Sequence, residues 1–234
     1  IEDYVYGHEF TFYVLTDGYT TVPLTSVANY KFMEEGGGGL LTSGVGAFAP
    51  DYKISRETEN YIMENIIARV ISSLQYKETP YLGILGVDCV LKDDGSISAL
   101  EFRTFLSDHD CMAVLNLIED NIYTLFEACA VGSFGDDYEA INLSDNASVS
   151  CVIYSKNEGK IISGIDLIDN QDDICHFNTR KNKYLEYETP CGKTLVITKT
   201  SKTLSRARLN LYEDIELIQF EGKKYRSDIC PAVK

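Results

Sequence analysis

Two acidic residues, Asp88 and Glu101, lie in apolar segments that the sequence predicts to be paired strands. These segments cover 81–91 and 96–102, and the Asp93-Asp94-Gly95 turn between them is typical of a hairpin. Two carboxylates on adjacent antiparallel strands could share one hard cation such as Mg²⁺, because the like charges would otherwise repel. The alternative is that each carboxylate faces solvent on a twisted hairpin. Spacing alone leaves both possibilities open.

A second candidate site is the glycine-rich segment Gly36–Gly46, which contains four consecutive glycines and the run Thr42-Ser-Gly-Val-Gly46. Such a segment is expected to be a loop whose backbone N–H groups can approach an anion closely. It is not a Walker loop, because no Gly-Lys-Ser/Thr follows it. The alternative is a flexible surface loop without a ligand.

The N-terminal segment carries acids on both sides of an apolar stretch and reads Ile1-Glu-Asp-Tyr-Val-Tyr-Gly-His-Glu9. This order is similar to a nucleotide hinge, in which backbone groups pair with adenine and a carboxylate binds the ribose hydroxyls. An ordinary strand end is the alternative. His109, between Asp108 and Asp110, belongs either to a catalytic cluster or to the solvated start of a helix.

Composition indicates a globular protein with little affinity for nucleic acid. The 234 residues are 44% hydrophobic and 24% charged, which suffices for a core and argues against disorder. The formal net charge of −15 disfavours nucleic acid and acidic membranes as partners, and no apolar run reaches membrane-spanning length. The seven cysteines include no Cys-x-x-Cys pair and are interpreted as buried, reduced thiols of a cytoplasmic protein.

The hydrophobic pattern predicts an α+β protein whose elements position these residues. A tight turn at Asp17-Gly18 is expected between two strands, a further strand is expected before Gly7, and Ser55 is expected to cap a helix near 57–75. The remaining predicted elements are helices at 111–131 and 203–220 and strands at 149–154, 183–187 and 194–198. The polar stretch 136–146 is the predicted boundary between domains at 1–135 and 147–234.

Five segments follow, in order, the motifs of one enzyme family. Residues 1–11 correspond to I-E-E-F-L-x-G-E-E-x-S, residues 15–23 to L-T-D-G-x-x-x-x-P, and residues 31–48 to K-R-x-x-D-G-D-x-G-P-N-T-G-G-M-G-A-Y. Residues 100–110 correspond to L-E-F-N-x-R-F-G-D-P-E, and residues 220–229 to F-x-G-x-x-Y-R-x-D-I. The chain therefore resembles the C-terminal half of phosphoribosylamine–glycine ligase, an ATP-grasp enzyme of purine synthesis, from Ile1 to about Cys230.

Several positions depart from the family's motifs. The metal-binding Asn of the family is Arg103, its Arg is Phe105, and the Asn of its P-N-T-G-G loop is Leu41. A guanidinium cannot ligate Mg²⁺, although it can bind a phosphate. Asp88 replaces a small residue of the family and is similar to an Asp of the D-alanine–D-alanine ligases, whose second acid follows at the same interval as Glu101.

The resemblance implies the C-terminal lobe of an ATP-grasp domain at 1–135 and a small C-terminal α+β domain at 147–234. It implies a cytoplasmic ligase in which ATP phosphorylates glycine and 5-phosphoribosylamine attacks the acyl phosphate, with Mg²⁺, or Mn²⁺ as the alternative, as the metal. The assigned residues are Glu2 and Val5 at adenine, Glu9 at the ribose, Asp88 and Glu101 at the metal, Arg103 at a phosphate, and Lys31, Thr42, Gly44 and Gly46 at the substrates.

The resemblance also implies a missing partner for this chain. The family's N-terminal half, which contributes the other side of the nucleotide cleft, has no counterpart in the sequence. We interpret the chain as a piece of a longer protein and expect it to be inactive alone. The altered motif at Arg103 leaves a second possibility, a degenerate ATP-grasp homologue that acts as a binding or scaffolding module.

Overall fold

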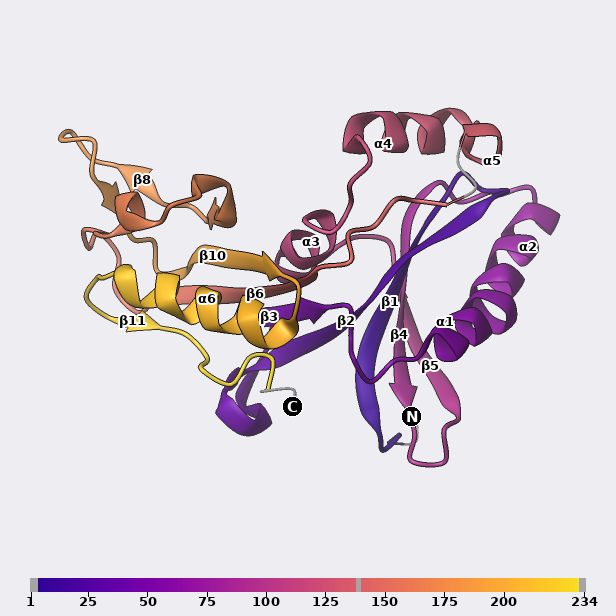
Figure 1. Cartoon of the computed structure of the whole chain (residues 1–234), viewed down its shortest axis with the longest axis horizontal. Coiled ribbons are helices and arrows are strands. Elements are labelled where there is room, and N and C mark those ends of the chain that lie inside the picture. The colour runs from indigo at the N-terminus through magenta and orange to yellow at the C-terminus, as the bar shows by residue number, and fades with distance from the viewer. Residues whose placement is uncertain (1–3, 138–139, 232–234) are drawn as a thin grey trace. The chain divides into compact units, whose positions relative to one another are not determined.

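The computed structural model describes residues 4–137 and 140–231, which form two compact units (Figure 1). Both units combine strands with helices, so the predicted α+β class is confirmed. The first unit contains Ile1–Ala28, Ala49–Leu106 and Val114–Asp145, and the second contains Asn29–Phe48, Ser107–Ala113 and Asn146–Lys234.

The first unit is built on an antiparallel sheet with the strand order β5-β4-β1-β2. The Asp17 side chain accepts hydrogen bonds from the N–H groups of Tyr19 and Thr20, which forms the predicted turn between β1 and β2. Residues 4–7, predicted to belong to a strand, are irregular, and 1–3 lie outside the described residues. The four strands are β1 (His8–Thr16), β2 (Thr21–Glu34), β4 (Gly83–Leu91) and β5 (Ile97–Arg103).

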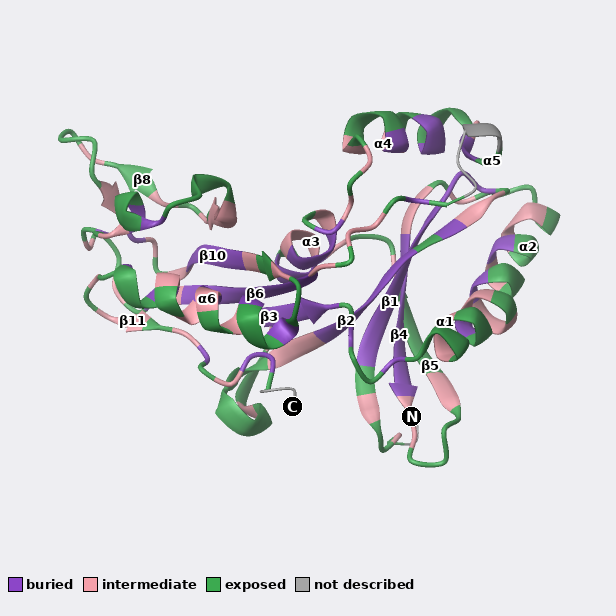
Figure 2. Ribbon diagram, viewed as in Figure 1, coloured by how far each residue is buried: buried purple, intermediate pink, exposed green. Residues whose placement is uncertain are grey.

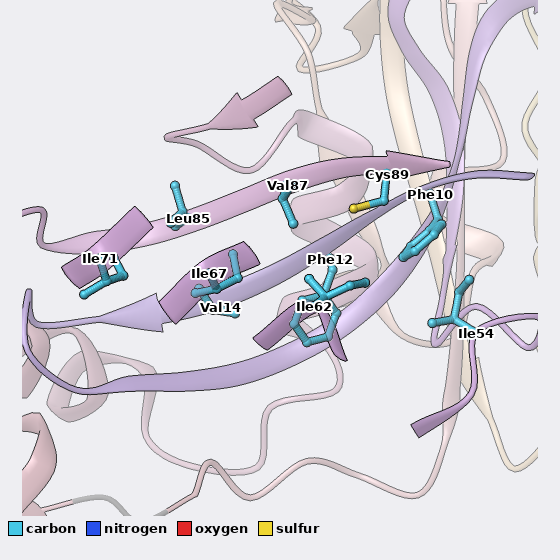
Figure 3. Packing of buried hydrophobic residues seen from close by; sticks show 10 residues of the cluster. All are labelled: Phe10, Phe12, Val14, Ile54, Ile62, Ile67, Ile71, Leu85, Val87 and Cys89. Atoms are coloured by element: carbon cyan, nitrogen blue, oxygen red, sulfur yellow. The ribbon is translucent and has the colours of Figure 1, made fainter. Parts of the chain in front are cut away.

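One face of this sheet is covered by a long helix. The helix consists of α1 (Arg56–Ile62), a π-helical turn at Met63–Ile67 and α2 (Ala68–Tyr76). Ser55 caps it by accepting a hydrogen bond from the Thr58 N–H, as the sequence predicts. Alternate side chains of β1 and β4 pack against the helix in a buried core (Figures 2 and 3). The core residues are Phe10, Phe12, Val14, Ile54, Ile62, Ile67, Ile71, Leu85, Val87 and Cys89.

The single helix predicted over 111–131 is wrong, because the chain forms two helices there. These are α3 (Asp108–Leu115) and α4 (Ile122–Val131), and the short α5 (Phe134–Asp137) follows. The break has a local cause: the Asn121 side chain accepts hydrogen bonds from the two N–H groups at the start of α4. An N-cap asparagine offers the backbone an alternative to continuing the preceding helix.

The second unit is built on a sheet in which the latter part of β2 is followed by β3, β6, β10 and β7. Their bounds are β3 (Gly38–Ala49), β6 (Ala147–Ser155), β7 (Ile174–His176) and β10 (Gly192–Ser201). The helix α6 (Leu204–Leu217) packs on β6 and β10 and buries the predicted apolar positions Leu204, Ala207, Leu211 and Ile215. The smaller elements are η1 (Glu35–Gly37), η3 (Ile165–Leu167), η4 (Gln171–Asp173), β8 (Arg180–Lys181), β9 (Tyr187–Glu188) and β11 (Lys223–Lys224).

Two predictions for the second unit are corrected. Most of the glycine-rich segment is not a loop. Only the short helix η1 forms a turn, and β3 begins directly after it at Gly38. The backbone of β3 forms hydrogen bonds with the neighbouring strand β6. The strand predicted at 183–187 is the turn and second strand of the β8–β9 hairpin. Strand pairing also groups 29–48 with 146–234, and the two units part at Asp145 and Asn146, within the polar stretch 136–146.

Four of the seven cysteines are buried as predicted, whereas Cys111 and Cys175 are half-buried and Cys191 is exposed. All seven cysteines are free thiols, and burial raises the pKa of Cys89 and of Cys151 to about 12, so both thiols stay protonated at neutral pH. Among the described residues, no helix combines the length and the apolar character that crossing a bilayer requires.

Candidate functional site

The predicted acid pair lies on the sheet of the first unit, on the paired strands β4 and β5. Asp88 is aligned with Glu101 on one side and with Thr11 of β1 on the other. Side chains alternate along a strand, and Phe10 and Phe12 point into the helix-covered core. Thr11 and the two acids therefore share the opposite face, because a register shift between Asp88 and Cys89 brings Glu101 opposite Asp88.

The guanidinium of Arg103 lies between the two carboxylates. Its Nε donates to Asp88 Oδ1 at 2.8 Å and its Nη2 donates to Asp88 Oδ2 at 2.6 Å, so this ion pair is bidentate. The same Nη2 donates to Glu101 Oε1 at 3.1 Å. Thr11 Oγ1 adds a hydrogen bond of 2.6 Å to Asp88 Oδ1. Arg103 thus joins both acids, and both oxygens of Asp88 accept hydrogen bonds.

Burial makes the contact of Arg103 with Asp88 much stronger than its contact with Glu101. The side chains of Asp88 and Arg103 are 3% and 16% exposed, whereas that of Glu101 is 63% exposed and screened by solvent. Desolvation lowers the pKa of Arg103, but its hydrogen bonds to Asp88 and the charge of Asp88 more than offset this, and the pKa is raised. Arg103 is therefore a permanent cation at this position.

This arrangement does not fit a Mg²⁺ site held by Asp88 and Glu101. Mg²⁺ requires oxygen ligands in near-octahedral geometry at about 2.0–2.1 Å, and it usually keeps several waters. Both oxygens of Asp88 are engaged by Arg103, and the carboxylate is almost inaccessible to water. Across 4–137 and 140–231, no group of three or more His, Cys, Asp or Glu residues is placed to hold a metal. The chemistry of this pair is that of carboxylates neutralised by arginine.

The residues predicted for the nucleotide are only partly described. Glu9 is exposed, belongs to the same face of β1 as Thr11, and is aligned with Val90 of β4. Val5 precedes the strand and is half-buried, and Glu2 lies outside the described residues. The first unit therefore places the predicted ribose ligand and the Asp88–Arg103 pair on one sheet face.

The residues predicted for the substrates lie in the second unit. Thr42 Oγ1 donates to the Lys31 carbonyl at 2.8 Å and accepts the Gly44 N–H at 3.0 Å. The structure thus brings together Lys31, Thr42 and Gly44 on β2 and β3. Gly46 follows on the same strand, where a Cβ would lie 2.8 Å from the Ser150 carbonyl oxygen and from Ile229 Cδ1. Close packing therefore explains this glycine without any ligand.

His109 is buried against Gly44, which the sequence did not reveal. A Cβ on Gly44 would lie 1.7 Å from His109 Cε1, so the imidazole occupies the space above this glycine. His109 Nε2 lies 3.2 Å from Asp110 Oδ1, and both side chains are nearly inaccessible to solvent. The helix start considered for these residues is present, since α3 begins at Asp108 and Asp108 is exposed, but His109 and Asp110 are buried and not solvated. Their residue types alone carry no signal of this burial.

A second arginine holds the turn before β3. Arg226 donates from Nε and Nη2 to the two oxygens of Asp228 at 2.7 and 2.5 Å, and from Nη1 to the Phe32 carbonyl at 2.9 Å. Asp228 Oδ2 also accepts the Gly36 N–H at 2.9 Å. These contacts give a structural reason for the Tyr-Arg-x-Asp-Ile order that the sequence analysis found near the C-terminus. We call Arg226 and Asp228 the C-terminal clamp.

Two family profiles match the chain in order. Residues 1–111 match the phosphoribosylglycinamide synthetase ATP-grasp (A) domain, and residues 154–232 match the C domain of the same enzyme. A phosphoribosylamine–glycine ligase of Neisseria meningitidis is 25% identical over 98% of this chain, which covers 55% of that protein. The chain therefore spans about half the length of the curated relatives it matches.

Solved structures share the fold. A phosphoribosylamine–glycine ligase of Thermotoga maritima superposes with a TM-score of 0.82 at 23% identity, over 97% of this chain and 57% of that one. The biotin carboxylase domain of the Hydrogenobacter thermophilus 2-oxoglutarate carboxylase, solved with MgADP, gives a TM-score of 0.62 at 14% identity, over 93% and 46%. At these identities the likeness concerns the fold alone.

Proposed function

Because the chain belongs to the phosphoribosylglycinamide synthetase family, we propose that a longer protein containing it joins glycine to 5-phosphoribosylamine with ATP. The γ-phosphoryl group passes to the glycine carboxylate and releases ADP. The amine then attacks the acyl phosphate, so that an amide forms and phosphate leaves. The collinear match of both enzyme domains, over residues 1–111 and 154–232, is the observation that carries this proposal.

The proposed nucleotide side is the face of the first unit's sheet that lies opposite the α1–α2 helix. Glu9 would bind the ribose, with Glu2 and Val5 near adenine. Arg103 would meet a phosphate oxygen, since its Nε and Nη2 bind the two acids while Nη1 makes no hydrogen bond within the described part of the chain. Guanidinium groups bind phosphate well because they present a planar set of donors. Lys31, Thr42, Gly44 and Gly46 would line the substrate side.

Turnover of the complete protein tests the proposal. We expect ADP formation that requires both glycine and 5-phosphoribosylamine, and we expect none from residues 1–234 alone. Glu9→Gln should raise the KM for ATP about tenfold, the size expected for one lost charged hydrogen bond. Glu57→Gln, an exposed acid at the start of α1, is the matched control and should not change it. Substrate-independent ADP formation, or turnover by the isolated chain, would contradict the proposal.

A further inference from the structure

The cation between Asp88 and Glu101 is part of the chain itself. We infer that Arg103 is the resident cation of this acid pair and replaces a divalent metal ion there. The inference rests on the proposed function only in treating this sheet face as the nucleotide side. The consequence is that a nucleotide phosphate would meet a guanidinium at this point, and no metal held by these two carboxylates.

Strand geometry explains how Arg103 reaches both acids. Arg103 follows Glu101 by two residues on β5, so its side chain belongs to the same face. Across from Arg103 on β4 lies Gly86, which has no side chain, and across from Gly86 on β1 lies Tyr13. A Cβ on Gly86 would lie 2.6 Å from the Tyr13 ring, so the ring already fills the space beside Gly86. The arginine side chain therefore extends diagonally toward Asp88.

The hydrogen bonds of Asp88 leave a metal ion no place without displacing the arginine. Asp88 Oδ1 accepts from Arg103 Nε and Thr11 Oγ1, and Oδ2 accepts from Arg103 Nη2. A guanidinium has donors only, so it cannot join a metal's ligand shell, and a second cation beside it would be repelled. Metal binding would require breaking a bidentate pair whose carboxylate is 3% exposed, which is costly for a buried charge.

The test measures Mn²⁺ binding to the complete protein by electron paramagnetic resonance, without nucleotide or turnover. Wild type and Glu101→Gln should bind Mn²⁺ equally weakly, because the pair holds none in either. Arg103→Met removes the cation and keeps the length of the side chain. It should gain one site that binds Mn²⁺ at least about tenfold more tightly than wild type does, since two facing carboxylates then need a counter-ion. Adding Asp88→Asn to Arg103→Met should abolish the gain.

Arg69→Met, at an exposed arginine of α2, is the matched control and should bind Mn²⁺ as wild type does. Mn²⁺ should also raise the thermal midpoint of Arg103→Met and leave that of wild type unchanged, because a ligand stabilises only a state that binds it. Weaker Mn²⁺ binding by Glu101→Gln than by wild type would overturn the inference, as would an Arg103→Met protein without a new site. Neither readout depends on ligase activity, so failure of the proposed function would be recognised separately.

Discussion

Replacing Gly44 by alanine is expected to destabilise the second unit by about 3–5 kcal/mol, as overpacking and backbone strain act together. The added Cβ would lie 1.7 Å from His109 Cε1, and the imidazole is 2% exposed, so it has little room to move away. The φ angle of Gly44 is +119°, a conformation that residues with a Cβ rarely adopt. Urea denaturation should show the loss, with hydrogen exchange in β3 and β6 locating it.

Gly36→Ala is the matched control for this substitution. Gly36 also has a positive φ of +67°, but nothing lies within 4 Å of the position its Cβ would take. The expected loss is therefore only the left-handed backbone cost of about 1–2 kcal/mol. Equal losses for the two variants would show that His109 does not occupy the space above Gly44.

Removing the cation of the C-terminal clamp has the second-largest expected effect. Arg226→Met should lower the free energy of unfolding by about 2–4 kcal/mol, below the range for a fully buried pair because Asp228 is 34% exposed. The substitution leaves the Phe32 carbonyl and Asp228 without their strongest donor. Arg206→Met, at an exposed position of α6, is the control and should stay close to wild type. If Arg226→Met loses no more free energy of unfolding than Arg206→Met does, the C-terminal clamp does not stabilise the fold.

The same clamp makes stability depend on acid pH. Burial raises the pKa of Asp228, but hydrogen bonds from Arg226 and Gly36 more than offset it, so the pKa lies below its ordinary value of 3.8. A lowered carboxylate pKa contributes stability that is present above the unfolded pKa and is lost as pH falls through the folded one. Asp228→Asn should therefore cost more at pH 7 than below pH 3.8. Urea denaturation of wild type and Asp228→Asn at the two pH values measures this, and an equal loss at both would contradict the contribution assigned to Asp228.

Local signals in the sequence were enough to predict the elements that carry the acid pair. The turn at Asp94-Gly95 fixes the β4–β5 hairpin, because Asp94 accepts hydrogen bonds from the N–H and hydroxyl of Ser96. The turn sets the register as far as Cys89 and Ala99, but a shift between Asp88 and Cys89 brings Asp88 opposite Glu101, and no local signal predicted that shift. The apolar period of α6 was likewise sufficient to identify its buried face.

Features that depend on distant partners could not be read from the sequence. The glycine-rich run suggested a loop, yet β3 forms because β6, about a hundred residues later, supplies its neighbour. The residue type of Arg103 excluded metal ligation, but its bidentate contact with Asp88 depends on cross-strand geometry and on burial. The burial of His109 depends on Gly44 in the same way. In each case the local sequence pattern was compatible with more than one structure, and tertiary packing determined which one forms.

The exchange of a metal for an arginine changes the charge balance on the face of the first unit's sheet that carries Asp88 and Glu101. Two carboxylates and one guanidinium sum to one negative charge, whereas the same carboxylates with a divalent ion would sum to zero. A triphosphate approaching this face would therefore meet a cluster that still repels it. The chain's formal net charge of −15 adds to that repulsion. Beyond the single contact proposed for Arg103, attraction for a polyanion must consequently come from cationic groups outside this cluster, and the affinity of the complete protein for ATP should depend on where those groups lie.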